Sequence, residues 1–407
     1  MSEDRLRTLL REEPLPGAAE AERRGLAVVE RAYAERRPAG RPVLPRLAVA
    51  LAAAALLAAL LLSPAGAAVR NWIGDVFTAG VPGARPALTK VPGGGRLLVQ
   101  SPRGPWVVQP DGSRRLLGHY DEASWSPHGL FVAAASGRTL SAIEPSGTPH
   151  WSVSATGPVS DPRWSPSGFR IAYRAGHALH VIRADGSGDR LLGQAAPVAP
   201  AWFPPGTHLL AYVDAAGRLR VVETDTSRTL ASTVATRGIT ALDWSADGRA
   251  LLELTPRGIW LRHLHLDKLA DRIRLGAPRR VSLPTDAVMR AAAFAPNRHT
   301  IAALLERDAG ANEPRSEALL INADGGPPHR LFAVSGHLDQ LAWSPNGNRL
   351  LLAWPAADQW LFLPISGRDH LQAISDIASV FSPGHRGQAL FPRIAGWCCP
   401  SSAKPGA

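Results

Sequence analysis

The sequence predicts an all-β propeller of seven blades, with six or eight as alternatives, preceded by a single N-terminal transmembrane helix. Three observations predict it: an aromatic-centred motif that recurs along most of the chain, short apolar runs separated by tight-turn sequences, and one long uncharged apolar stretch near the N-terminus. The predicted parts are a cytoplasmic helical segment (1–46), a transmembrane helix (47–69), a juxtamembrane linker (70–88), the propeller (89–395) and a C-terminal tail (396–407).

The repeated motif reads Trp-Ser-Pro-x-Gly in its clearest copies. Its aromatic residues are spaced by 39, 38, 42, 50 and 49 positions, which is typical of small sheet-built repeats such as propeller blades. We expect each aromatic side chain to pack as a wedge between neighbouring sheets, which is a structural role. These residues are Trp125, Trp164, Trp202, Trp244, Phe294 and Trp343.

Some copies of the motif are incomplete. Asp247 follows Ala246 where proline is expected, and Arg298 replaces the usual glycine. The segment Pro92-Gly93-Gly94-Gly95 reads as a decayed first copy, which brings the count to seven. The segment Phe381-Ser382-Pro383-Gly384 resembles an eighth copy, but too little chain follows it for a full blade. It could instead supply the strand that closes the ring.

The residues between motifs have the composition of β-hairpins. Each motif is followed by a short apolar run and then by a second run that ends in a turn, as in Leu179–Arg183 followed by Ala184-Asp185-Gly186. Apolar runs bounded by Pro-Gly and Asp-Gly turns predict strands joined by tight hairpins. Three or four such strands form a small twisted sheet with two apolar faces, and stacking the sheets around an axis buries both.

These features resemble a known repeat. Trp164-Ser165-Pro166-Ser167-Gly168, followed by Ile171-Ala172-Tyr173 and the turn Ala184-Asp185-Gly186-Ser187, resembles the WD40-like propeller repeat of the TolB family. The resemblance covers roughly residues 89–395 and is specific for the fold but not for the function. It implies an extracytoplasmic binding scaffold.

The apolar stretch Leu47–Val69 contains 23 residues and no charge. At about 1.5 Å per helical residue it is long enough to span a hydrocarbon core of about 30 Å. Five arginines precede it and two follow it closely, and this asymmetry predicts a cytoplasmic N-terminus. A cleaved signal peptide is the alternative, because Ala65-Gly66-Ala67 fits a cleavage site, but the 46 residues before the stretch argue against it.

Composition narrows the classes of partner. The net charge of +11 comes almost wholly from arginine, but the basic residues are spread along the chain rather than gathered into runs, so we expect no nucleic-acid partner. The only cysteines, Cys398 and Cys399, are adjacent and cannot join distant segments. They could form a vicinal disulfide or remain a reduced pair.

No catalytic motif is recognisable, so we expect a protein that is not an enzyme and has no cofactor. The best metal candidate is His263, His265 and Asp267, but three residues in line on one strand give poor tetrahedral geometry, and we assign no metal ligand. The segment 185–189 resembles a calcium loop superficially, and its place in the repeat favours a hairpin turn.

Ligand-binding residues are expected at the mouth of the central channel, where loops lead into the innermost strands. The residues just before each motif aromatic occupy those positions, and their carboxylates mildly favour a cationic or hydrogen-bonding ligand. Turn and strand residues without a ligand are the alternative interpretation. The candidates are Tyr120, Asp121, Glu122, Asp161, Arg163, Asp243, Arg290 and Asp339.

Two functions fit these observations. The first is a membrane-anchored, extracytoplasmic binding module for an envelope protein, peptide or glycan. The second is a transmembrane signalling protein of the anti-sigma type, in which the propeller senses and residues 1–46 hold a sigma factor. Leu26, Val29 and Tyr33 form a modest apolar stripe on a predicted cytoplasmic helix, which favours the second function. The absence of histidine and cysteine before residue 119 excludes a zinc-type anti-sigma motif.

Overall fold

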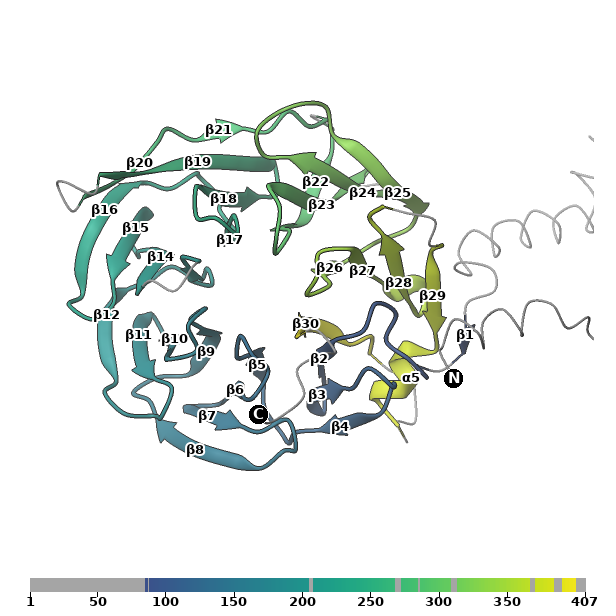
Figure 1. The fold of residues 1–407 in the computed structure, drawn as a ribbon, viewed down its shortest axis with the longest axis horizontal. Helices are drawn as coiled ribbons and strands as arrows, with labels where there is room; N and C mark the ends of the chain where they lie inside the picture. The colour runs from purple at the N-terminus through teal and green to yellow at the C-terminus, as the bar shows by residue number, and fades with distance from the viewer. Residues whose placement is uncertain are drawn as a thin grey trace, which may run out of the picture. The chain divides into compact units, whose positions relative to one another are not determined.

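The predicted seven-bladed β-propeller is confirmed by a computed structural model, which describes residues 85–86, 88–204, 208–267, 272–284, 286–308, 313–366, 370–383 and 390–399. In this part of the chain, seven sheets surround a central axis (Figure 1). Successive strands of each sheet pair antiparallel from the inside outwards, except for one short parallel strand at the outer edge of the last sheet. The buried apolar residues form clusters that lie largely between adjacent sheets.

The first four blades each contain four strands. Blade 1 consists of β30 (Arg393–Cys398), β2 (Arg96–Ser101), β3 (Gly104–Val108) and β4 (Arg114–Leu116). Blade 2 consists of β5 (Glu122–Trp125), β6 (Val132–Ser136), β7 (Thr139–Ile143) and β8 (Pro149–Ser154). Blade 3 consists of β9 (Val159–Trp164), β10 (Arg170–Ala175), β11 (Ala178–Arg183) and β12 (Arg190–Gln194). Blade 4 consists of β13 (Ala201–Trp202), β14 (Leu209–Val213), β15 (Arg218–Glu223) and β16 (Arg228–Val234).

Of the last three blades, blades 5 and 7 each carry one additional strand. Blade 5 consists of β17 (Ala241–Trp244), β18 (Ala250–Thr255), β19 (Gly258–Asp267) and β20 (Arg272–Leu275), with β21 (Arg279–Arg280) also paired to β19. Blade 6 consists of β22 (Val288–Phe294), β23 (Thr300–Arg307), β24 (Arg315–Asn322) and β25 (His329–Ser335). Blade 7 consists of β26 (Gln340–Trp343), β27 (Arg349–Trp354), β28 (Gln359–Pro364), β29 (Gln372–Ser375) and β1 (Arg85–Pro86). A 3-10 turn, η1 (Pro355–Ala357), and a short helix, α5 (Ile377–Phe381), complete the elements.

The repeated motif forms the turn that ends each innermost strand. In blade 2, the Ser126 hydroxyl accepts the N–H of Phe131 at 3.0 Å and so stabilises the turn into β6. Gly129 has a φ of 63°, a left-handed conformation that glycine adopts without steric cost. We call the face of the ring that carries these turns the rear face, and the face on which the innermost strands begin the front face.

The ring closes through the C-terminal strand. β30 pairs with β2, so blade 1 combines an inner strand from the end of the chain with outer strands from its beginning. Trp397 lies opposite Leu97, in the register that Trp125 has opposite Val132. Trp397 therefore completes the decayed first motif, and its indole N–H donates to Gly94 at 2.8 Å.

The closing strand is not the segment that resembles an eighth motif. Residues Ile377–Phe381 form helix α5, whose Phe381 ring packs against Trp106 and Trp360. The strand that closes the ring begins twelve residues after Phe381, at Arg393, and continues to Cys398. The predicted propeller range 89–395 is therefore shorter at both ends than the range of strands, which begins with β1.

The predicted cytoplasmic segment and transmembrane helix, residues 1–69, lie outside the described residues. Among the described residues, no helix combines the length and apolar character needed to cross a membrane.

Candidate binding surfaces on the two faces of the ring

The eight predicted ligand-binding residues all belong to the innermost strands or to the loops directly before them. Glu122, Asp161, Arg163, Asp243 and Arg290 lie on β5, β9, β17 and β22. Tyr120, Asp121 and Asp339 precede β5 and β26. The structure brings Glu122, Asp161 and Arg163 within electrostatic range of one another, and it brings Arg290 near Asp339.

Several of the predicted carboxylates already hold neighbouring strands together. Glu122 accepts the backbone N–H of Asp161 in the next blade at 2.7 Å. Asp161 in turn accepts Nε of Arg174 at 2.8 Å. Asp121 accepts the N–H of Gly137 at 3.0 Å. These contacts give the three carboxylates structural partners, so the preference for a cationic ligand stays a prediction without support from them.

Asp243 also links two blades. Its carboxylate accepts the N–H of Phe294 in blade 6 at 2.7 Å and the N–H of Trp244 at 3.0 Å. Burial raises the pKa of Asp243 to about 6, against the two backbone hydrogen bonds, which favour the ionised form. Asp243 therefore links blades 5 and 6, the one junction at which the motif residue of the following blade is phenylalanine rather than tryptophan.

Arg290 and Asp339 belong to a second charged group. Arg290 donates twice to Glu306, at 3.1 and 2.9 Å, and His337 contacts the same carboxylate at 2.8 Å. Burial alone would raise the pKa of Glu306, but the bonds from Arg290 and His337 hold it below its ordinary value. Glu306 is fully buried. Tyr120, the remaining predicted residue, is half-buried, and its carbonyl accepts Nε2 of Gln100 at 2.8 Å.

A groove of about 850 Å³ lies on the front face, beside the start of blade 5. Its walls include Arg237, Arg257, Pro256 and the Trp260 ring. The guanidinium of Arg280 lies 5.6 Å from the centre of that ring and donates to the Arg257 carbonyl at 2.9 Å. The groove therefore presents cationic groups and an aromatic surface together.

On the rear face, a cavity of about 450 Å³ lies among four of the innermost strands' ends. Its walls come from β5, β9, β30 and the loop after β26. Cys398 and Cys399 line it and form the disulfide that the sequence left open. Arg163, placed by prediction at the channel mouth, also lines this cavity.

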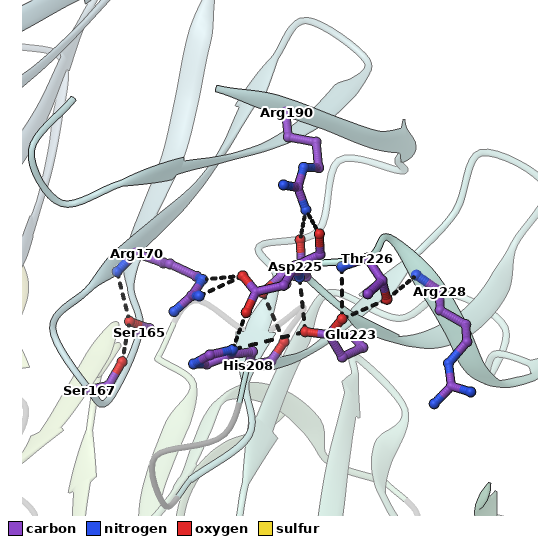
Figure 2. Close-up of polar contacts among 10 residues, drawn as sticks. Ser165, Ser167, Arg170, Arg190, His208, Glu223, Asp225, Thr226 and Arg228 are labelled. Atoms are coloured by element: carbon purple, nitrogen blue, oxygen red, sulfur yellow. Dashed lines mark hydrogen bonds and ion pairs between the residues drawn. The ribbon is translucent and has the colours of Figure 1, made fainter. Parts of the chain in front are cut away.

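Among the described residues, one group combines histidine and carboxylate closely enough to share a metal ion: His208, Glu223 and Asp225, on the rear of blade 4. Figure 2 shows that this group is already connected. Arg170 of blade 3 donates to Asp225 Oδ1 at 2.9 Å, and Thr226 donates to Glu223 Oε2 through its N–H at 2.8 Å. Because a guanidinium already neutralises Asp225, we interpret the group as an ionic link between blades 3 and 4.

The two motifs considered for metal binding have ordinary structural positions. His263 and His265 are exposed on one side of β19. In the segment 185–189, Asp185 Oδ1 accepts the N–H of Ser187 at 2.9 Å, and Gly186 has a φ of 82°, which describes a hairpin turn.

Sequence reasoning missed the front groove and most of the rear cavity. Arg257 lies in the turn between β18 and β19, and Trp260 lies near the start of β19, where a search of the residues before each motif could not find them. Ser124 and Trp397 line the rear cavity, but nothing in their own neighbourhood indicates that the two ends of the chain meet there.

Comparisons with known proteins give the fold alone. No family model matches the chain, and no curated protein matches it. The β-propeller domain of Cps50 (Swd1) from Myceliophteria thermophila is similar, with 15% identity and a TM-score of 0.54, covering 67% of this chain and 94% of that one. KlHsv2 with loop 6CD replaced by a Gly-Ser linker gives 12% identity and a TM-score of 0.51, covering 69% and 93%. With its ring of seven sheets, this chain has the fold of a seven-bladed β-propeller.

Proposed function

We propose that the chain is a binding module without catalytic activity, which engages an envelope protein, peptide or glycan through the front face of its propeller. The fold is consistent with a protein-binding module. The observation that carries the proposal is the front groove, because its size and composition suit an extended partner.

The chemistry of the groove indicates which partners it favours. Arg237 and Arg257 offer guanidinium groups that pair well with carboxylates, and Trp260 offers a flat apolar surface. Arginine and tryptophan are the residue types most often responsible for binding energy at protein interfaces. We therefore infer that the partner carries acidic groups beside apolar ones.

We further propose that the propeller is anchored in a membrane and faces the extracytoplasmic side, the side that its resemblance to TolB-like repeats implies. The uncharged stretch Leu47–Val69 and the arginines before it support this topology. Protease added to intact cells should then digest the propeller, and protection of the propeller would contradict the topology.

The signalling function is kept as the second candidate because of the apolar stripe at Leu26, Val29 and Tyr33. If the predicted cytoplasmic segment holds a sigma factor, replacing Leu26 and Val29 by aspartate in the full chain should abolish its recovery with the protein. Equal recovery with both chains would exclude the stripe as the contact.

A site-specific photo-crosslinker tests the binding function. A benzophenone side chain placed at Arg257 in the front groove should crosslink to a discrete envelope component in living cells. The matched control carries the same group at Phe169, which is 69% exposed on the rear face. Identical products from both positions, or none from position 257, would reject the front face as the binding surface.

A further inference from the structure

The hydrogen bonds between blades differ around the ring, and one of the junctions that lacks the usual bond lies at the rear cavity. At three junctions, the indole N–H of the motif tryptophan donates to a backbone carbonyl in the preceding blade. That carbonyl belongs to the residue directly before the preceding blade's own motif aromatic. The pairs are Trp202 with Arg163 at 2.8 Å, Trp244 with Ala201 at 3.2 Å, and Trp343 with Ala293 at 3.0 Å. This bond is absent for the indoles of Trp125 and Trp164, whose N–H groups are buried and have no partner among the described residues.

Blade 2, which carries Trp125, also contributes an unpaired hydroxyl. Ser124 is only 8% exposed, and its Oγ has no hydrogen-bond partner in the described part of the chain. Both Ser124 and Trp125 line the rear cavity. Buried donors without partners are rare in folded proteins, because each costs about 1–3 kcal/mol. Two of them beside one cavity indicate a place for a bound acceptor.

Arg163 adds a positive charge to the same cavity. Its side chain makes one hydrogen bond, from Nη1 to the Pro162 carbonyl at 3.0 Å. Within the described residues, no carboxylate lies within ion-pair distance of it, since Asp161 is paired with Arg174 and Glu122 accepts a backbone N–H. The loss of hydration lowers the pKa of Arg163, against the opposing effect of Asp161 and Glu122, so an anion beside it would restore favourable interactions.

Most of the other side chains in the walls are apolar, with Ser126 as a further polar one. Trp125 and Trp397 contribute indole surfaces, Pro127 and Pro345 contribute rings, and the Cys398–Cys399 disulfide contributes sulfur. The volume of about 450 Å³ falls within the range of small-molecule sites. An occupant that suits these walls has an apolar or aromatic body and a single acceptor-rich group.

We propose that the rear cavity binds the carboxylate of an apolar or aromatic acid, with Arg163 as its counter-ion and Ser124 as a second donor. The acid is either a free organic acid or the C-terminus of a peptide. The guanidinium is the first group that the ligand meets, because the Ser124 hydroxyl lies just beneath the cavity wall. Rotation about the Cα–Cβ bond of Ser124 to another staggered rotamer would bring the hydroxyl to the ligand. This site is independent of the partner proposed for the front face.

The test uses the full-length chain in lipid nanodiscs, with 3-phenylpropanoate and its neutral amide as probes in saturation-transfer NMR. Arg163→Gln should weaken binding of the acid by about tenfold or more, as expected for a lost charge-assisted pair. Arg249→Gln, which removes an arginine that is 79% exposed on the rear of blade 5, is the matched control and should leave the affinity unchanged.

Ser124→Ala keeps the test decisive if Arg163→Gln fails to fold. It should weaken binding of the acid by a smaller factor than Arg163→Gln does and leave binding of the amide unchanged. Equal binding of acid and amide, or full affinity in both cavity variants, would overturn the proposal. The peptide Ala-Ala-Phe with a free or an amidated C-terminus distinguishes the two sources. Tighter binding of the free peptide than of 3-phenylpropanoate assigns the site to a peptide C-terminus, and the reverse assigns it to a free acid.

Discussion

The front and rear faces of the ring both carry charged groups near the axis, but these groups are used differently. On the front face, Glu122 and Glu306 accept hydrogen bonds from a neighbouring strand or side chain. On the rear face, Arg163 and Ser124 line a cavity without equivalent partners among the described residues. A charged residue at a strand end therefore does not by itself mark a binding site. A buried donor that lacks a partner, where the same position in other blades is paired, is better evidence for one.

The largest effect should come from breaking a paired group on the front side. Arg262 donates to Glu253, and both side chains are buried. Arg262→Ala leaves the Glu253 carboxylate buried with the Thr236 N–H as its one donor among the described residues, so the free energy of unfolding should fall by about 3–5 kcal/mol. Chemical denaturation measures this, and Arg249→Ala is the exposed control. Similar losses in both variants would contradict the comparison.

The next effect depends on pH. The folded-state pKa of Asp243 is about 6, above its ordinary value of 3.8, so the folded protein keeps a proton that the unfolded chain releases between these values. The contribution of Asp243 to stability therefore decreases as the pH rises from about 4 to 6, by at most about 3 kcal/mol, and stays constant above.

Asp243→Asn cannot titrate, so its unfolding free energy should lack this decrease when denaturation at pH 4 is compared with pH 7. The comparison is made within each protein, because the variant also loses a hydrogen bond. The same decrease in both proteins would show that Asp243 is not the titrating group.

The motif tryptophans provide a smaller, paired comparison. Trp202→Phe removes the indole bond to the Arg163 carbonyl, whereas Trp125→Phe removes an N–H that has no partner among the described residues. The first change should therefore cost about 1 kcal/mol more unfolding free energy than the second. A greater loss for Trp125→Phe would mean that its N–H is satisfied in the protein.

Two neighbouring serines give the smallest expected effect. Ser126→Ala removes the acceptor of the Phe131 N–H and should cost about 1 kcal/mol. Ser124→Ala removes an unpaired hydroxyl and should leave stability unchanged or slightly higher. Thermal unfolding of the ligand-free chain measures both changes, and a destabilised Ser124→Ala would show that its hydroxyl has a partner in the folded protein.

The fold could be predicted from the sequence because each blade repeats the same local signals. The motif serine, the glycine and the aromatic residue all act within a few residues of one another, as in Trp125-Ser126-Pro127-His128-Gly129. Ring closure could not be predicted in detail. Trp397 completes a motif whose glycines lie 303 residues earlier, and Cys398-Cys399 does not resemble Ser-Pro.

The candidate sites were harder to predict than the fold. Position before a motif aromatic identifies residues of the innermost strands, although Asp243 and Arg163 lie at the rear ends of β17 and β9 rather than at the channel mouth where the loops lead in. It cannot indicate that Asp243 accepts a backbone N–H from the next blade. Nor can it indicate that Arg163 has no carboxylate within ion-pair distance among the described residues. Those differences depend on the register between blades, which a single sequence does not contain.

A crystal structure of the full chain grown with 3-phenylpropanoate would test the contrast between the faces most directly. The account predicts the carboxylate within hydrogen-bond distance of the Arg163 guanidinium on the rear face, with the phenyl ring against Trp125 or Trp397. An acid bound only among Arg237, Arg257 and Trp260 on the front face, with water beside Arg163, would contradict it.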